Sequence, residues 1–212
     1  MREGPASRSP ASPSAPLSEP GGIHGTVDTE RAAASDLELL RTAFPDGRPL
    51  GWEGVRAFEA EQGIVLPEPY RTFAAEICGG AYAAGPPEYG LVALGALPDD
   101  WGRNRPKRDP AKPFPLAETW IWDGDPEADE KPDELYDAIT GHGSIVLGTE
   151  GCGMYWHLIL NGEHRGRIWM ISGEGAAAYG AESGWTTAEP GFVGWVEHWV
   201  EGGDWFDAAT GE

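Results

Sequence analysis

The sequence predicts an α+β fold, a single domain in which a mainly antiparallel sheet is packed by N-terminal helices and a C-terminal amphipathic helix. Three observations predict it: helical spacing of apolar residues comes first along the chain, strand-like runs follow, and a strongly amphipathic helix comes last. A parallel sheet would need strands and helices in alternation, which this order lacks. A length of 212 residues suits one domain with a tail.

Both ends of the chain are predicted to be tails. Residues 1–34 combine Pro, Ser, Ala and Gly with few large apolar side chains, so burial cannot offset the entropy of ordering them. We therefore expect a disordered segment over 1–34, a folded domain over 35–206 and a short tail over 207–212.

Three helices are expected at the start of the domain. The first begins near Asp36, a candidate N-cap, and ends at Pro45. The second spans about 52–62 and stops at Gly63. The third starts at Pro67, because proline suits the first helical position. Its apolar face is predicted to consist of Tyr70, Phe73, Ala74 and Ile77.

The middle of the chain is predicted to form a sheet that carries a long insertion. A Pro-rich, charged insertion covers about 95–140, and its first part, 95–118, is expected to be a loop. Trp156 and Leu158 alternate with His157, which is typical of a strand with two different faces. Strands are expected at 89–94, 119–122, 143–148, 154–160 and 166–172.

The last predicted element is an amphipathic helix with a heavy aromatic face, ended by Gly202 and Gly203. This face is expected to belong to the core, the alternative being a groove for a partner. Its apolar residues recur at helical spacing: Phe192, Trp195, Val196, Trp199 and Val200.

The segment from Gly63 to Gly80 contains a helix stop, Leu-Pro, an aromatic residue three positions after the proline, further apolar residues and a closing Gly-Gly. Together with the Gly-rich segment 148–153, the strand pair and the terminal helix, this order resembles the SUKH superfamily over about 52–201. That superfamily includes fungal cell-wall synthesis regulators and bacterial immunity proteins. Cys78 departs from its pattern, which usually has Asn there, and this puts the local hydrogen bonding in question. The matching signature residues are Gly63, Leu66, Pro67, Tyr70, Phe73, Gly79, Gly80 and Trp195.

The resemblance implies a binding protein that needs no catalytic residues, metal or cofactor. Bacterial relatives neutralise toxin domains, often nucleases or deaminases, by binding them, and fungal relatives act as signalling scaffolds. The first hypothesis is therefore a non-enzymatic immunity protein with a basic toxin as partner. The second is a regulatory scaffold for an endogenous protein. The third is a hydrolase that uses Cys78 or Cys152 with His157.

An acidic segment is the feature most suggestive of a partner. Residues 118–137 hold nine acids against one lysine, and tryptophans lie among them. Aromatic anchors inside a charged rim are typical of protein interfaces, although the same segment could be a solvated loop over two core tryptophans. The residues predicted to bind the partner are Trp120, Trp122, Asp123, Asp125, Glu127, Asp129, Glu130, Asp133 and Glu134.

Two metal sites were weighed against this sequence. The acidic segment imitates a calcium loop, but Ala128 stands where the sharp turn needs glycine. His157 and His164 are expected on neighbouring strands, near Cys152, yet without the spacing of zinc ligands. The basic loop is expected to pair with the acidic segment rather than to bind phosphate. Its charged residues are Arg103, Arg105, Lys107, Arg108 and Lys112.

The overall charge of −20 indicates which partners to expect. Such a surface repels nucleic acids and anionic membranes and attracts basic proteins. Two cysteines are few for a secreted disulfide scaffold, no apolar run reaches about 18 residues, and the N-terminal residues lack a signal-peptide pattern. We therefore expect a cytoplasmic protein with reduced thiols that acts as a monomer.

Overall fold

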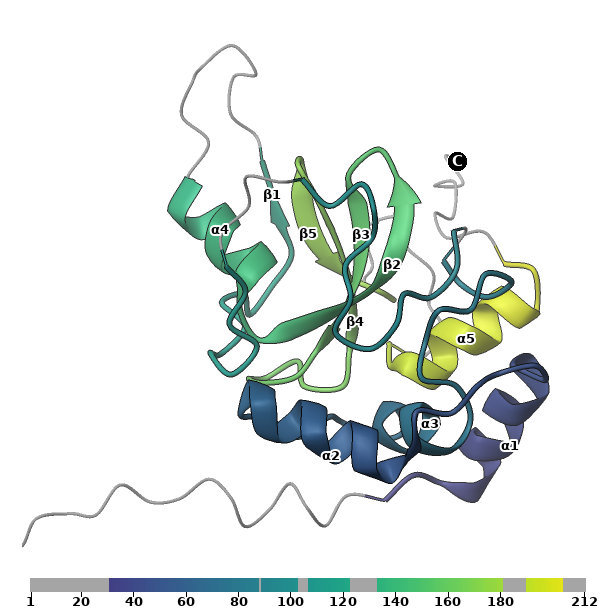
Figure 1. Ribbon diagram of the computed structural model, residues 1–212. Coiled ribbons are helices and arrows are strands. Elements are labelled where there is room, and N and C mark those ends of the chain that lie inside the picture. The colour runs from purple at the N-terminus through teal and green to yellow at the C-terminus, as the bar shows by residue number, and fades with distance from the viewer. Residues whose placement is uncertain (1–30, 88, 103–106, 123–132, 181–189, 204–212) are drawn as a thin grey trace, which may run out of the picture.

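The computed structural model describes residues 31–87, 89–102, 107–122, 133–180 and 190–203. Over these residues it is a mixed α+β domain with a five-stranded sheet, as the sequence predicts (Figure 1). The predicted tails, 1–34 and 207–212, lie almost entirely outside the described residues. The elements are α1 Ala34–Ala43, α2 Gly51–Gln62, α3 Tyr70–Glu76, β1 Trp120–Ile121, α4 Asp133–Gly141, β2 Ser144–Gly151, β3 Met154–Ile159, β4 Ile168–Ser172, β5 Gly175–Ala178 and α5 Phe192–Val200.

The sheet has the strand order β1-β5-β4-β3-β2, and every pair of neighbours is antiparallel. Strands β2 to β5 are consecutive neighbours, so short turns connect them. The turn between β2 and β3 holds Gly151, Cys152 and Gly153, all with positive φ. This confirms that the Gly-rich segment is a tight turn between strands. Strands β1 and β2 form the two edges of the sheet.

The two faces of the sheet are covered by different parts of the chain. Trp156 and Leu158 point into a large core shared with α1, α2, α3 and α5, which lie together on one side in Figure 1. On the other face, Trp169 and Ile171 form a smaller core. Helix α4 supplies Ile139 to that core, and the 95–118 loop covers the remainder of the face.

The first helices agree with the prediction in position, and differ at two of their starts. Helix α1 begins at Ala34 after an Ala33 cap without a side-chain bond, so Asp36 lies in the first turn and is not the N-cap. A carboxylate there still interacts favourably with the helix dipole. Helix α2 ends at Gly63, whose φ of 67° is the expected left-handed stop. Helix α3 begins at Tyr70 rather than Pro67, because Pro69 disfavours a helical conformation at the residue before it.

The predicted strand at 89–94 is wrong, and two elements of the sheet layer were not predicted. Leu91 makes only an isolated bridge with Tyr82, and the Val92 N–H donates to the Leu147 carbonyl at 2.9 Å. Strand β5 and helix α4 were both missed. The remaining strands and α5 lie where they were expected.

The aromatic face of α5 is core, as the first interpretation holds. Phe192 and Trp195 are fully buried, and the half-buried Trp199 ring stacks on Phe44 of the segment after α1 at 6.2 Å. A partner groove on this face is therefore not supported. None of the helices in the described part of the chain has the length and apolar character that crossing a bilayer requires.

Candidate functional site

The described part of the predicted partner site centres on the edge strand β1. Trp120 is half-buried and packs against the smaller core, and it pairs with Ala176 of β5. Trp122 is also half-buried, and its N–H donates to the Glu174 carbonyl at 2.8 Å. Between them Ile121 is 65% exposed, an unusual position for a large apolar side chain at the rim of an acidic region.

The acidic residues around β1 are only partly described. Asp123, Asp125, Glu127, Asp129 and Glu130 lie outside the described residues. Helix α4 starts at Asp133 and stands beside β1 in Figure 1. The same small core contacts Leu135 of α4 and Trp120 of β1, so the two elements share one side of the sheet. Around them, four carboxylate residues are exposed: Glu118, Glu134, Asp137 and Glu174.

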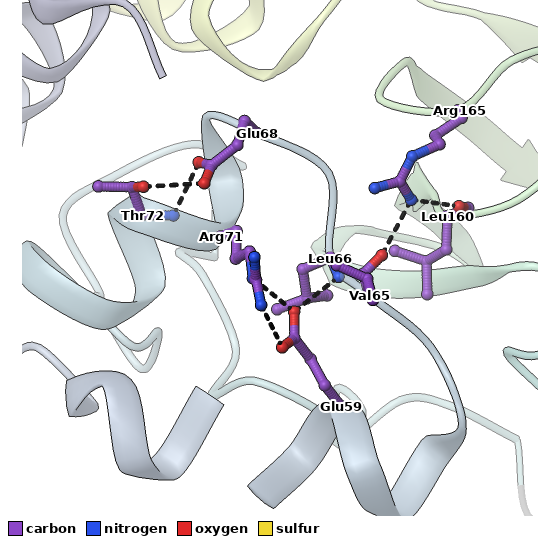
Figure 2. Close-up of polar contacts among 8 residues, drawn as sticks. All are labelled: Glu59, Val65, Leu66, Glu68, Arg71, Thr72, Leu160 and Arg165. Carbon is purple, nitrogen blue, oxygen red and sulfur yellow. Dashed lines mark hydrogen bonds and ion pairs between the residues drawn. The ribbon is translucent and has the colours of Figure 1, made fainter. Parts of the chain in front are cut away.

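The segment with the family signature is held by a buried carboxylate (Figure 2). Glu59 of α2 is 6% exposed and accepts the Leu66 N–H at 2.9 Å. Its carboxylate also pairs with Arg71 of α3, with the Arg71 Nε at 2.8 Å from Oε1 and Nη2 at 2.9 Å from Oε2. A charge-assisted pair of this kind fixes the chain that connects α2 to α3.

Two further contacts fix the same connection, also shown in Figure 2. Arg165, from the loop between β3 and β4, donates to the Val65 carbonyl at 2.9 Å and to the Leu160 carbonyl at 2.6 Å. The Glu68 carboxylate accepts the Thr72 N–H and hydroxyl, both at 3.0 Å. The Glu68 side chain thus satisfies a free N–H at the start of α3.

The aromatic signature residues meet in the large core. Tyr70 packs edge-on against Phe192 at 5.0 Å, and Phe73 lies 4.9 Å from the same ring. Trp195 packs against Trp156 of the sheet at 5.7 Å. Burial raises the pKa of the Tyr70 phenol well above its usual value, and the nearby Cys78 adds to this. These residues therefore join α3, α5 and β3 into one core and contact no open surface.

The closing glycines answer the question that Cys78 raises. Gly80 has a φ of 96°, and a Cβ there would overlap the Val92 carbonyl oxygen. Cys78 is buried, and its thiol donates to the Gly80 carbonyl at 3.7 Å. The thiol therefore serves as a weak local donor at the position where the family usually has Asn.

The order of these elements, from α2 through the signature segment to the sheet, can be compared with known families. The family model described as the SMI1 / KNR4 family (SUKH-1) matches residues 53–189, which is more than half of the chain. The protein belongs to this family. No curated protein and no solved structure matches the chain.

The thiols of this SMI1 / KNR4 protein do not form the cysteine–histidine site of the third hypothesis in the arrangement described. Cys78 belongs to the large core, whereas His157 alternates with Trp156 and lies on the opposite face of the sheet. The His157 Nδ1 lies 2.9 Å from the Ser144 hydroxyl. Cys152 is exposed in the turn between β2 and β3.

The expected pairing of histidines on neighbouring strands is wrong. His164 lies in the loop before β4, where its ring packs 4.9 Å from Trp169 and its Nε2 lies 2.8 Å from the Ala117 carbonyl. His157 is buried on β3 among Ser144 and Trp101. Over the described residues, no three His, Cys, Asp or Glu side chains are grouped as metal ligands would be.

The basic loop makes contacts that were not predicted. Arg108 donates to the Ser144 carbonyl at 2.6 Å and to its hydroxyl at 3.0 Å, and its guanidinium lies 5.3 Å from the centre of the Trp101 ring. Lys112 lies 3.9 Å from Asp109. These contacts are within the loop and to β2, and not to the acidic segment. Arg103 and Arg105 lie outside the described residues.

Some of the residues that organise this SMI1 / KNR4 domain could have been found in the sequence, and others could not. Glu59 falls on the apolar face of α2, and an acid at such a position indicates a buried partner. Arg108 and Ser144 are 36 residues apart, and Arg165 and Val65 are 100 apart. No local spacing predicts such pairs.

Proposed function

We propose that this protein is a non-catalytic immunity protein that acts in the cytoplasm and neutralises a basic toxin domain by binding it. Membership of the SMI1 / KNR4 family supports a role in immunity or in regulatory binding. The proposed contact surface is the acidic edge, defined here as Glu118, Trp120, Ile121, Trp122, Glu134, Asp137 and Glu174.

The observation that carries the proposal is the exposure of Ile121. It is 65% exposed on an edge strand, between two half-buried tryptophans and within a rim of carboxylates. An apolar residue that a partner can cover, surrounded by charge, is the usual anatomy of a protein interface. We expect Ile121 to supply much of the affinity and the carboxylates to supply recognition.

The charge of the chain selects the partner. A net charge of −20 attracts proteins that carry Lys and Arg on their binding surface. Toxins that hold nucleic acids display such surfaces, because phosphate contacts dominate nucleic-acid affinity. The same charge disfavours nucleic acids and anionic lipid surfaces as direct partners of this protein.

The proposal is tested with the protein encoded by the neighbouring gene. The two proteins are co-expressed, and the survival of the cells and the association of the purified pair are measured. In the same pair, Ile121→Ser should weaken binding about tenfold through faster dissociation, because it removes an apolar anchor. Glu134→Lys should slow association at low salt.

Glu38→Lys is the matched control, because Glu38 is an exposed acid on α1, on the opposite side of the sheet. If Glu38→Lys and Glu134→Lys slow association equally, the contact is not at the acidic edge. If the pair does not associate and the toxin still kills, the immunity function is rejected.

The alternative is a regulatory scaffold that binds an endogenous protein through the N-terminal tail. Deletion of residues 1–34 distinguishes the two functions. Neutralisation of a toxin at the acidic edge should survive this deletion, whereas a tail-dependent scaffold should lose its partner.

A further inference from the structure

A cavity at the β2 edge of the sheet differs in charge from the rest of the molecule. Its volume is about 490 Å³, and it lies between the end of α2, the 95–110 loop and the start of β2. The residues that give it its character are Phe58, Gln62, Trp101, Lys107, Arg108 and Ser144. Two of these are cationic, and no carboxylate lies among the described residues that line it.

The charge of this cavity is opposite to that of the chain as a whole, which is −20. An adjoining hollow of about 520 Å³ shares Gln62, Lys107 and Arg108 with it and adds Lys112. Carboxylates occur only in that second hollow, where Glu61 and Asp109 line it. The positive potential is therefore concentrated in the first cavity, where concave walls strengthen it.

The cation at the wall of this cavity is fixed in place. The Arg108 Nη2 donates to both the carbonyl and the hydroxyl of Ser144, and the Ser144 hydroxyl lies 2.9 Å from the Nδ1 of the buried His157. The guanidinium also lies over the Trp101 ring. A charge that is already oriented loses little conformational freedom when an anion binds beside it.

The opposite wall is held just as firmly. Trp101 packs edge-on against Tyr155 at 4.6 Å, and the Tyr155 hydroxyl donates to the Asp100 carbonyl at 2.7 Å. The Thr149 hydroxyl donates to the Asp100 carboxylate at 3.0 Å. The loop that carries Trp101 is thus fastened to β2 and β3, so the cavity does not depend on a loose surface segment.

We propose that this cavity binds a small organic anion that carries a planar or apolar group, with a phosphate or carboxylate facing Lys107 and Arg108. The apolar part of the ligand would lie against Phe58 and Leu97, and the Gln62 amide would supply a neutral hydrogen bond. A volume of this size suits a ligand as large as a nucleoside monophosphate. The cavity and the acidic edge lie at opposite edges of the sheet, so this site is independent of the proposed function.

The test is a calorimetric titration of the full-length protein with adenosine 5′-monophosphate, adenosine, inorganic phosphate and benzoate. Adenosine monophosphate is expected to bind with a dissociation constant below about 1 mM, because it combines charge and ring. Adenosine lacks the charge and inorganic phosphate lacks the ring, so both should bind more weakly. Benzoate shows whether a carboxylate can replace the phosphate.

The position is checked with two charge reversals at exposed residues. Lys107→Glu lies at the cavity and should weaken binding about tenfold, because attraction becomes repulsion at short range. Arg167→Glu, at the start of β4, makes the same charge change away from the cavity and should leave binding unchanged. In NMR spectra, the amides of Gln62 and Gly95 and the indole of Trp101 should shift on binding.

Three results would overturn the proposal. One is the absence of saturable binding of both adenosine monophosphate and benzoate. Another is equal weakening by Lys107→Glu and Arg167→Glu, which would indicate general electrostatic attraction. The third is equal affinity for inorganic phosphate and adenosine monophosphate, which would leave the apolar wall without a role. Tighter binding of benzoate than of adenosine monophosphate would support the site with a carboxylate as its ligand.

Discussion

Glu59 is a carboxylate on the apolar face of α2, and three N–H groups of Leu66 and Arg71 meet it there. Glu59→Gln would leave the Arg71 guanidinium, which is 13% exposed, without its counter-charge. Removing one partner of a buried pair costs about 3 kcal/mol. We expect the free energy of unfolding, measured in urea, to fall by about this amount.

Glu61→Gln makes the same chemical change two residues later on α2, at an exposed position. Its unfolding free energy should stay within about 0.5 kcal/mol of the unchanged protein. Equal losses in the two variants would mean that net charge, and not the buried pair, accounts for the effect.

Tyr70 predicts how stability depends on alkaline pH. Burial, and secondarily the nearby Cys78, raises the pKa of the folded-state phenol above its unfolded value of about 10. The folded state therefore holds this proton more tightly. The contribution is complete below about pH 10 and is lost above it, by up to about 1.4 kcal/mol per pH unit.

The measurement is the urea midpoint at pH 8 and at about pH 11, where the unfolded phenol is ionised. Tyr70→Phe cannot ionise, so its midpoint should fall less between these two values. Parallel falls in both proteins would assign the alkaline loss to other groups.

At the level of elements, the turn after α3 depends on glycine. Gly80→Ala should lower the unfolding free energy by about 3 kcal/mol, because the methyl group meets the Val92 carbonyl and φ is positive. Gly153→Ala pays only the positive φ, since nothing lies within 4 Å of its Cβ, and should cost about 1 kcal/mol. Similar losses at both positions would show that the approach of Val92 is unimportant.

The elements that sequence reasoning located are those whose apolar spacing is strong. Helix α5 and strands β2 to β4 have such spacing, and they lie where it predicts. Strand β5 consists of Gly175 and three alanines, which have little strand propensity, so only pairing with β4 specifies it. Helix α4 was hidden among acids and prolines. The predicted strand at 89–94 contains Gly90, whose φ of 80° is incompatible with a regular strand.

The candidate site was predictable in its composition and not in its geometry. The sequence indicates that Trp120 and Trp122 accompany an acidic segment and that a short strand carries them. It does not indicate that this strand pairs with β5 at an edge or that Ile121 is left exposed, since both follow from the unpredicted β5. The cavity beside Arg108 depends on contacts over long separations, which periodicity does not register.

For the whole molecule, the charge of −20 predicts a salt effect on stability. Self-repulsion among the acids destabilises the compact state, and salt screens it over about 10 Å at 0.1 M. Raising NaCl from about 0.05 to 0.5 M should therefore raise the urea midpoint. KCl should act equally if screening is the cause. An unchanged or lower midpoint would show that the acids are already balanced by local contacts.

Strand β1 is attached to the sheet along one side only, through Trp120, Ile121 and Trp122, while β4 lies between two neighbours. Amide protons of an outermost strand exchange with deuterium sooner than those of a central one, because a small local opening is enough to release them. Anything that covers this strand must slow that exchange, whatever its chemical identity. The protein thus carries its own reporter of occupancy, and a deuterium-labelling experiment in crude extract would register a bound partner before that partner had a name.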